Sequence, residues 1–429
     1  MLREDLSRNF GFLLNDVARL MRTAYDRRIR KLGLTRERSS RSMSGILVAW
    51  LTISKARTSA ALAPGIMDGH DTIQSQGGDG MRGAVFLGNK QIEIRSFPDP
   101  TPGPGEVVIQ MKASGMCGSD LKFYRPPPGE AQKALGLGSN VEPFIGGHEP
   151  CGVIAARGAG VSEREAPIGQ RVMNHHYAGC GVCGHCRVGW SQLCRAGIVV
   201  YGVTGNGGHA QYLKAPARTM VPLPDELSFS EGAAVSCGTG TAFGALRRMH
   251  TQGGQTLAVF GQGPVGLSAT LIGAKMGARV IAVETNKERL ALAKQFGATD
   301  LVDASKEDVV KALKDLTRGE GVDLTLECSS APAARQAAVR AVRTWGTACF
   351  VGEGGDVTLD VSPDLLRRQV TLIGSWTFSA MGMGDCARFV ADNGIKLDRI
   401  FTHRWKLDQA NEAYKVFDAQ SSGKGVIEF

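Results

Sequence analysis

The sequence contains no apolar run long enough to cross a membrane. The longest, GILVAWLTI at residues 45–53, is about half of the roughly 18 residues that a membrane-spanning helix needs. The first residues, MLREDLSRNF, carry charges of both signs and lack the apolar core of a secretory signal peptide. We therefore expect a cytoplasmic protein with no membrane partner, in which thiols stay reduced.

A basic stripe of the kind that binds nucleic acid is also missing from most of the chain. Residues 1–80 carry 13 Lys and Arg against 8 Asp and Glu, and residues 81–429 carry 37 against 33. The strongest basic cluster, RRIRK at 27–31, lies in the short first part. Because nucleic-acid binding needs basic side chains gathered on one face, we expect no nucleic-acid partner.

Residues 1–80 differ in character from the rest. Apolar residues recur at steps of three or four between residues 9 and 33, which predicts an amphipathic helix, and residues 1–38 resemble the first helix of MarR-type regulators. Residues 39–80 show no period and are rich in Ser, Ala and Gly, which predicts a linker or disorder. Our hypothesis is that this extension derives from a neighbouring reading frame or an upstream start. Recovery of residues 1–80 from the native protein by N-terminal sequencing would contradict it.

The chain from residue 81 onward is predicted to be an α/β protein. Residues 81–238 read as short strands separated by Gly and Pro turns. From residue 239, strands such as TLAVF and RVIAVE alternate with helices of 10–15 residues. This alternation predicts βαβ units and a parallel sheet.

A glycine-rich turn opens the second part. Gly261-x-Gly263-x-x-Gly266 follows an apolar strand and precedes a helix. Gly261 allows the tight turn, Gly263 lets the backbone approach a pyrophosphate, and Gly266 lets helix and strand pack closely. The sequence therefore predicts a dinucleotide site.

An acidic residue after the next strand bears on the choice of coenzyme. Glu284 lies 18 residues past Gly266, where a carboxylate accepts hydrogen bonds from ribose hydroxyls and repels a 2′-phosphate. NAD is therefore favoured over NADP. Lys287 and Arg289 lie nearby and keep NADP open as an alternative.

Four of the ten cysteines lie within fifteen residues. Cys180, Cys183 and Cys186 are spaced C-x2-C-x2-C, and Cys194 follows. Disulfides suit short secreted chains, a redox CxxC uses only two thiols, and an iron–sulfur cluster remains an alternative. Tetrahedral zinc would use all four thiolates and leave no open position. We predict a structural zinc site that cannot bind substrate.

Three further segments hold residues that can bind a metal: SGMCGSDLKFY with Cys117, FIGGHEPCGV with His148 and Glu149, and AAVSCGTGTAF with Cys237. A single cysteine is usually a buried small apolar residue. In order and spacing, however, these motifs with the cysteine cluster and the glycine turn closely resemble zinc-dependent medium-chain alcohol and polyol dehydrogenases, which include threonine and sorbitol dehydrogenases. The resemblance covers residues 81–429.

The resemblance implies a catalytic zinc in addition to the structural one, so two Zn²⁺ per chain. Cys117, His148 and Cys237 would be its ligands, with a fourth position open to a small-molecule alcohol. Glu149 is a neighbouring carboxylate that would exchange on and off the metal, or serve as third ligand in place of Cys237. Zinc would act as a Lewis acid on the alcohol, and a hydride would pass to the nicotinamide.

The resemblance also implies a proton path. Ser119 matches the hydroxyl that takes the alcohol proton, and Asp120 matches an outer anchor of the site. Many relatives have His where this chain has Lys122. An ammonium cannot accept a proton at neutral pH unless its pKa is depressed, so the outer end of the relay departs from the family pattern.

Fold and coenzyme contacts are implied in the same way. We expect a GroES-like catalytic domain at 81–238, a Rossmann NAD-binding domain at 239–374, a return to the catalytic domain at 375–429, and a homodimer or homotetramer. The residues expected to bind the coenzyme are Gly261, Gly263, Pro264, Val265, Gly266, Glu284, Arg289, Thr241, Val351 and Lys424.

Some residues and questions fall outside these assignments. Extra histidines and cysteines are read as structural or buried groups: His175, His176, His185, Cys151, Cys328, Cys349 and Cys386.

A zinc-free reductase on the same fold would lack the Cys and His ligands, and a regulator using the N-terminal helix would need a recognition helix. The loop 125–143 matches no known specificity, so secondary alcohols, polyols and amino alcohols all remain candidate substrates.

Overall fold

The computed structural model describes residues 80–134, 143–419 and 423–429. These residues belong to the compact unit Ile73–Phe429. The helix predicted at 9–33 and the linker predicted after it lie outside the described residues. So do residues 135–142 of the loop named above.

The first part of the described chain is made of short strands. They are β1 (Met81–Gly88), β2 (Gln91–Phe97), β3 (Glu106–Gly115), β4 (Phe144–Ile145), β5 (Glu149–Arg157), β6 (Arg171–Asn174), β7 (Tyr177–Ala178), β8 (Val199–Val200), β9 (Tyr212–Pro216) and β10 (Met220–Pro222). Asn89 and Lys90 both have positive φ, as a two-residue hairpin between β1 and β2 requires.

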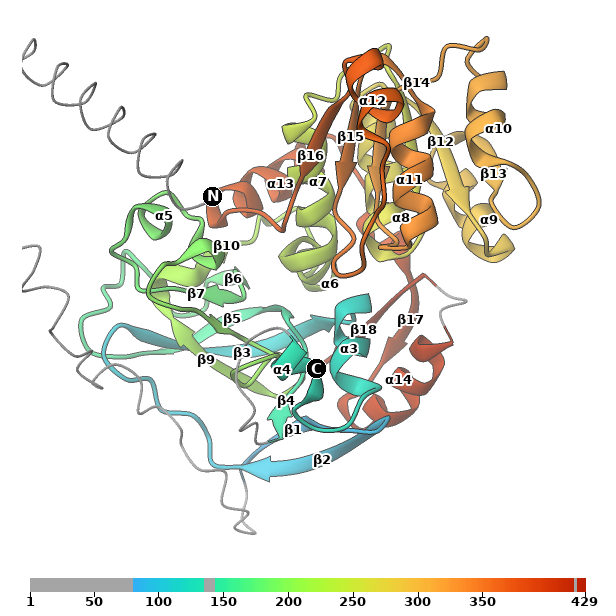
Figure 1. The fold of residues 1–429 in the computed structure, drawn as a ribbon. Helices are drawn as coiled ribbons and strands as arrows, with labels where there is room; N and C mark the ends of the chain where they lie inside the picture. Colours follow the sequence, from blue (N-terminus) through green and yellow to red (C-terminus); the bar gives the residue numbers. More distant parts are fainter. Residues whose placement is uncertain (1–79, 135–142, 420–422) are drawn as a thin grey trace, which may run out of the picture. The chain divides into compact units, whose positions relative to one another are not determined.

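Two larger sheets and the antiparallel pair β7-β8 organise this part, and the end of the chain joins one of the larger sheets (Figure 1). One sheet has the order β2-β1-β4, and the other has the order β10-β6-β5-β3-β18-β17 with β9 paired to β3. β17 (Phe401–Trp405) and β18 (Lys424–Glu428) are the last strands of the chain. β18 pairs with β3, so the carboxyl-terminal segment returns to the β-rich part.

The second part is a six-stranded parallel sheet with the order β13-β12-β11-β14-β15-β16 (Figure 1). Its strands are β11 (Thr256–Phe260), β12 (Arg279–Glu284), β13 (Ala298–Asp303), β14 (Val322–Glu327), β15 (Val342–Phe350) and β16 (Thr371–Gly374). The predicted α/β fold class is confirmed. Strands β13 and β16 were not predicted, because both are edge strands that are only partly buried and lack a continuous apolar run.

Helices connect and cover the strands. Their bounds are α3 (Leu121–Tyr124), α4 (Glu130–Ala134), α5 (Gly184–Arg187), α6 (Phe229–Ala234), α7 (Gly240–Arg248), α8 (Pro264–Lys275), α9 (Lys287–Gln295), α10 (Val309–Asp315), α11 (Pro332–Ala341), α12 (Val361–Asp364), α13 (Ala380–Asp392) and α14 (Ala410–Asp418). α8 begins with Pro264 at its first turn, where the missing N–H costs nothing. Most of α8 is buried, which places the glycine-rich turn at the edge of a packed core.

The strand order reverses beside β11, whose neighbours are β12 on one side and β14 on the other. In open parallel sheets, ligands bind outside the carboxyl ends of the strands at such a switch point. The glycine-rich turn follows β11 directly. The fold therefore puts the predicted dinucleotide turn where such sheets bind ligands.

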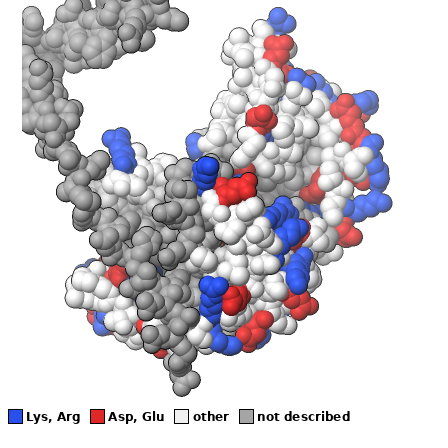
Figure 2. All heavy atoms as spheres, turned by 60° about the horizontal axis from the view of Figure 1, so that its bottom comes forward, with Lys and Arg blue, Asp and Glu red and all other residues white. Residues whose placement is uncertain are grey.

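Within the described residues, no helix is both long and apolar enough to span a bilayer. On the face drawn in Figure 2, basic and acidic side chains are interspersed.

Candidate functional site

Strand register brings distant candidate residues to one end of the seven-stranded sheet. Gly115, the last residue of β3, pairs with Glu149 on β5 and with Val426 on β18. Cys117 follows two residues after β3, and His148 immediately precedes β5. A Cβ on Gly115 would lie 1.9 Å from Glu149 Oε2, so glycine is needed there to leave room for that carboxylate.

Four predicted metal-binding side chains meet at this point. The ligand atoms of Cys117, His148, Glu149 and Cys237 all lie within 4.8 Å of one another, and all four residues are buried. Cys237 lies in a π-helical turn, Val235–Thr239, between α6 and α7. Such turns are rare and frequently occur at functional sites. The structure thus joins three segments that the sequence separates by up to 120 positions.

Ser119 and Asp120 contact this group directly. Ser119 Oγ donates to Cys117 Sγ at 3.3 Å and lies 3.1 Å from His148 Nε2. Asp120 Oδ2 accepts a hydrogen bond from the Cys117 amide at 2.8 Å, and its Oδ1 lies 2.6 Å from His148 Nδ1. Ser119 therefore lies on the inner side of the group, and Asp120 supports it from outside.

A buried cation lies beside Glu149. Lys424 Nζ forms an ion pair with Glu149 Oε2 and donates to the Met116 carbonyl at 3.1 Å. The other carboxylate oxygen of Glu149 accepts from the Gly238 amide at 3.4 Å. A Cβ on Gly238 would lie 3.7 Å from Lys424 Nζ and 3.9 Å from Pro264 Cβ. Lys424 is thus near the start of α8 as well as near the metal group.

The electrostatics of the group favour a thiolate at Cys117. The hydrogen bond with Cys237 lowers the pKa of Cys117 well below its usual range, although burial opposes this shift. Burial raises the pKa of Glu149 to about 8. A thiolate is the form of cysteine that binds metal. The donor set of two thiols, one imidazole and one carboxylate fits zinc.

Lys122 points to the nucleotide-binding half of the chain. Its ammonium donates to the Glu353 carbonyl at 3.0 Å and lies 3.8 Å from the Glu353 carboxylate. Glu353 follows β15, 231 positions away. The structure therefore gives Lys122 a contact that bridges the β-rich part and the parallel-sheet part of the chain.

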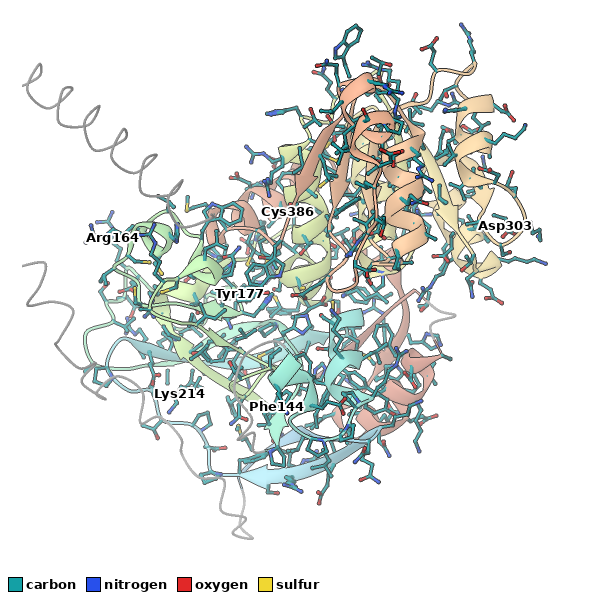
Figure 3. All side chains as sticks on the ribbon, in the orientation of Figure 1. Phe144, Arg164, Tyr177, Lys214, Asp303 and Cys386 are labelled. Carbon is teal, nitrogen blue, oxygen red and sulfur yellow. The ribbon has the colours of Figure 1, made fainter. Side chains whose placement is uncertain are left out.

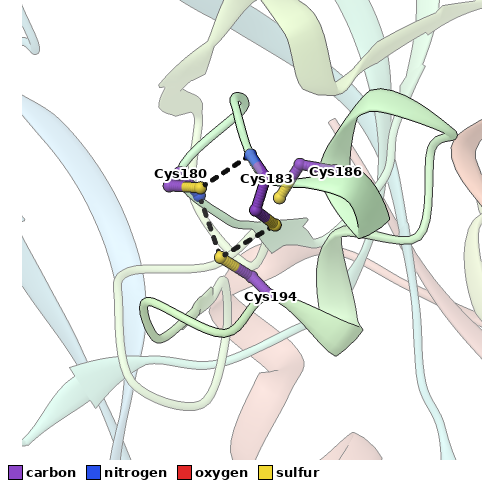
Figure 4. A group of neighbouring side chains, drawn as sticks. All are labelled: Cys180, Cys183, Cys186 and Cys194. Carbon is purple, nitrogen blue, oxygen red and sulfur yellow. Dashed lines mark hydrogen bonds between the residues drawn. The ribbon is translucent and has the colours of Figure 1, made fainter. Parts of the chain in front are cut away.

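The second metal-binding group is the cysteine lobe (Figure 4). The sulfur atoms of Cys180, Cys183, Cys186 and Cys194 lie within 4.8 Å of one another. The Cys180 amide donates to Cys194 Sγ at 3.3 Å, and the Cys183 amide donates to Cys180 Sγ at 3.4 Å. Backbone hydrogen bonds lower the pKa of Cys183 to about 6, and burial raises the pKa of Cys186 to about 12.

The spacing of these thiols fits tetrahedral zinc. Zn–S bonds of about 2.3 Å place two ligand sulfurs about 3.8 Å apart, and Cys183 Sγ lies 3.9 Å from Cys194 Sγ. All ten cysteines are free thiols. His185 Nδ1 lies 2.6 Å from the Leu193 carbonyl, so this extra histidine has a contact within the lobe and is not in the thiol group.

The glycine turn has the geometry that the motif predicts. Gly261 has φ +81°, which an L side chain rarely adopts. A Cβ on Gly266 would lie 1.8 Å from the Gly261 carbonyl oxygen. A Cβ on Gly263 would meet only Arg289 Nη1, at 3.9 Å. The backbone beside Gly263 is therefore open to a ligand, with a guanidinium close by.

The Glu284 carboxylate points toward the glycine-rich turn. Its Oε2 accepts from the Gln262 amide at 2.7 Å, and its Oε1 accepts from the amides of Thr285 at 2.7 Å and Asn286 at 3.1 Å. Arg289 is one turn into α9, and Lys287 is exposed at its start. The carboxylate therefore lies between the strand end and the glycine turn.

Two segments of the chain match the models of known protein families. Residues 103–225 match the alcohol dehydrogenase GroES-like domain, and residues 264–392 match the zinc-binding dehydrogenase domain. The zinc-type alcohol dehydrogenase-like protein YphC of Escherichia coli K12 is 39% identical over 81% of this chain and 99% of its own length. This chain belongs to the zinc-dependent medium-chain alcohol dehydrogenases.

Other similar proteins are dehydrogenases whose names give different substrates or coenzymes. Sorbitol dehydrogenase of Bacillus subtilis 168 is 30% identical over 78% of this chain and 92% of its own. Among solved structures, 2R,3R-butanediol dehydrogenase of B. subtilis is 27% identical with TM-score 0.70, and a putative zinc-binding dehydrogenase of Sinorhizobium meliloti 1021 bound to NADP is 26% identical with TM-score 0.70. Each match covers 81% of this chain and 99% of the relative.

These matches confirm several predictions. The chain is a zinc-containing oxidoreductase that acts on CH–OH groups, and it has the GroES-like and Rossmann folds. The predicted domain boundaries and the roles of individual site residues stay predictions.

A cavity of about 370 Å³ is lined by residues of the cysteine lobe and of the parallel-sheet part of the chain. Its walls include Trp190 and Leu193 of the cysteine lobe, Val351 and Glu353 after β15, and Trp376. Val351 is one of the predicted coenzyme residues, and Glu353 contacts Lys122. Thr241, another of them, is buried in the first turn of α7, directly after the turn that carries Cys237.

His176 and Tyr177, which were not predicted to be site residues, lie between this cavity and the metal-binding group. The Trp376 ring lies 5.6 Å from Tyr177 (labelled in Figure 3), which lies 4.2 Å from His176. The His176 ring lies 5.1 Å from that of His148, and its Nδ1 lies 3.2 Å from the Ser236 carbonyl. Their position just before the cysteine lobe was the only sequence signal.

The remaining extra residues belong to neither of the two metal-binding groups. His175 Nε2 lies 3.1 Å from the Phe378 carbonyl, in a packing role. Cys151, Cys349 and Cys386 are buried, and Cys328 is half-buried.

Proposed function

We propose that this chain oxidises a secondary alcohol, polyol or amino alcohol with NAD, using one catalytic and one structural zinc ion. The observation that carries the proposal is the buried group of Cys117, His148, Glu149 and Cys237 beside the Ser119 hydroxyl. A zinc-free reductase would not need such a donor set. The sorbitol and butanediol dehydrogenases among the relatives support the substrate class.

Cys117, His148 and Cys237 are proposed to hold the catalytic zinc. Glu149 is engaged by Lys424 and by the Gly238 amide, which supports an exchanging role for its carboxylate in place of a permanent one. Three protein ligands leave one position for the alcohol. A zinc ion there would supply a Lewis acid that favours the ionised form of the alcohol oxygen.

Ser119 is proposed to take the proton that the alcohol loses. Ser119 Oγ lies within hydrogen-bond distance of two ligand atoms, Cys117 Sγ and His148 Nε2. Its oxygen would accept a proton from an alcohol oxygen beside these atoms as its own proton passes on to water. Lys122 is held by Glu353, so water is proposed to carry the proton away from Ser119.

This division between Ser119 and Lys122 gives a test. Ser119→Ala is expected to slow hydride transfer by about 10²–10⁴-fold, the usual contribution of a positioned proton acceptor. Lys122→Gln should leave that step within a few-fold at pH 7, because the ammonium serves as a bridge. Single-turnover formation of NADH measures the step without product release. An equal, large loss in Lys122→Gln would show that lysine is part of the relay.

Glu284 is proposed to select NAD. Its carboxylate, held by the Gln262 amide, can accept hydrogen bonds from a free ribose. A 2′-phosphate would bring up to two like charges to about 4 Å, each costing about 1 kcal/mol in water and about 4 kcal/mol at an effective dielectric of 20. Several kilocalories correspond to a factor of hundreds or more in affinity.

Replacing Glu284 by serine is therefore expected to weaken NAD and admit NADP, with Lys287 and Arg289 supplying positive charge. The ratio of kcat/KM for the two coenzymes should shift toward NADP by about 100-fold or more. Glu288→Ser, which removes a carboxylate in the exposed first turn of α9, is the matched control and should leave the ratio unchanged. A wild type that already prefers NADP would overturn the coenzyme assignment, as would a ratio that does not move.

The substrate can be identified by a panel of alcohols scanned by NADH absorbance. It should include primary alcohols, 2,3-diols, hexitols and threonine, each with NAD and NADP. Turnover of secondary alcohols or polyols above the primary alcohols is the expected result. Exclusive use of primary alcohols would contradict the proposed class.

We also propose a homo-oligomer. β16 is an edge strand of the parallel sheet, and Leu372 on it is 41% exposed. Unpaired strand edges favour pairing with another chain. Sedimentation or light scattering of the full chain would test for a dimer or tetramer, and a monomer at micromolar concentration would contradict the proposal.

A further inference from the structure

A series of five buried polar side chains leads away from the metal group. Ser114 Oγ lies 2.8 Å from His209 Nδ1, and His209 Nε2 lies 2.8 Å from the Tyr414 hydroxyl. Tyr414 donates to Asp120 Oδ2 at 2.9 Å, and Asp120 Oδ1 lies 2.6 Å from His148 Nδ1. Each of the five residues is at most 4% exposed. We call this series the ladder.

The direction of every hydrogen bond in the ladder follows from its chemistry. Asp120 accepts at Oδ2 from both the Cys117 amide and the Tyr414 hydroxyl. Because the Tyr414 hydroxyl donates its only hydrogen to Asp120, its oxygen must accept the hydrogen bond from His209 Nε2. His209 Nδ1 then keeps its lone pair, and the Ser114 hydroxyl donates to it. Burial lowers the pKa of His209 to about 4, in keeping with a neutral ring that has a single N–H.

The ladder ends by fixing the protonation of His148. Its Nδ1 is 2.6 Å from Asp120 Oδ1, a close contact in which neither atom meets the geometry of a regular hydrogen bond. Two lone pairs at this distance would repel each other, so Nδ1 carries the proton. In the neutral imidazole, which is the form that binds metal, the lone pair is then on Nε2. Nε2 is also the nitrogen beside Ser119, on the inner side of the metal group.

His209 also holds the backbone next to His148. A Cβ on Gly147, the residue before His148, would lie 2.4 Å from His209 Nδ1. The Gly208 amide donates to the Gly147 carbonyl at 2.7 Å, and the His209 amide donates to the Gly146 carbonyl at 3.0 Å. The segment around His209 thus packs against Gly146 and Gly147, the two residues before His148, through both side chain and backbone.

We propose that Tyr414 and His209 are positioning residues of the catalytic metal site, which hold Asp120 and His148 in the one arrangement that presents Nε2 to the metal. This inference rests on the proposed metal site and adds to it two residues far from the ligands in sequence. Tyr414 lies 294 positions from Asp120. Outer partners of a metal-binding His fix its tautomer and orientation, and their loss typically costs 10–100-fold in metal affinity or activity.

The test compares Tyr414→Phe with the wild type by release of zinc to a coloured chelator. Tyr414→Phe should lose the catalytic zinc about 10–100-fold faster, while the zinc of the cysteine lobe leaves at its wild-type rate. The visible absorption of Co²⁺ bound in the Cys–His site should change as well. Tyr124→Phe is the matched control, because its ring is 5.5 Å from Tyr414 but its hydroxyl is not part of the ladder.

The outcomes separate the ladder from the proposed function. A wild type whose only zinc is held by the cysteine lobe overturns both. Two zinc ions in the wild type with unchanged release in Tyr414→Phe overturn the ladder alone, and so does an equal acceleration in Tyr124→Phe. If Tyr414→Phe does not fold, Ser114→Ala removes the outermost donor in its place. It should accelerate the same zinc loss several-fold, and a wild-type rate would again overturn the ladder.

Discussion

Cys117→Ser is expected to abolish alcohol oxidation while the protein stays folded. Serine keeps the size of the side chain but removes the thiolate at the centre of the buried group of four ligand atoms. Loss of the Lewis acid removes several kcal/mol of transition-state stabilisation. Because each 1.36 kcal/mol is tenfold in rate, kcat/KM should fall by at least about 10³-fold.

Metal analysis should accompany this measurement. The wild type is expected to contain close to two zinc ions per chain and Cys117→Ser close to one, since the cysteine lobe is untouched. Cys386→Ala is the matched control, because this buried cysteine lies in α13 outside both metal-binding groups; it should keep both zinc ions and most of the activity. An active Cys117→Ser protein with two zinc ions would refute the assignment of the catalytic ligands.

Cys183→Ser is expected to damage stability first and activity only as a consequence. Cys183 precedes α5, and its amide and sulfur contact two other thiols of the lobe. A structural zinc contributes its binding free energy to folding, about 10–16 kcal/mol in small zinc peptides. Whole domains are stable by only about 5–15 kcal/mol. Losing even about 4 kcal/mol should lower the melting temperature of a unit of this size by about 5 °C.

Thermal unfolding with and without a chelator measures this effect. The chelator should destabilise the wild type and leave Cys183→Ser nearly unchanged, because the variant has already lost the lobe zinc. Cys117→Ser provides the comparison, since it should keep a chelator-sensitive melting temperature. If the two variants are equally stable and equally active, the division into structural and catalytic sites is wrong.

Local patterns in the sequence were enough to predict the fold class and most of the residue types that bind metal. The GxGxxG turn, the four closely spaced cysteines and the alternation of strands and helices each depend on neighbouring residues, so their geometry can be read from spacing. Gly261 illustrates this, because a positive φ is a property of the turn itself. The edge strand β16 was missed for the same reason, since its exposed residues leave no periodic signal.

The sequence by itself thus determined the dinucleotide turn, the cysteine lobe and, through resemblance, which Cys and His residues to consider as ligands. Only the tertiary structure decided what surrounds them. The pairing of β3 with β5 and β18 brings Lys424 to Glu149, α14 brings Tyr414 to Asp120, and the loop after β15 brings Glu353 to Lys122. These contacts join residues more than 200 positions apart, and no local period encodes them. They depend on strand register and helix docking, which are set by packing of the whole unit.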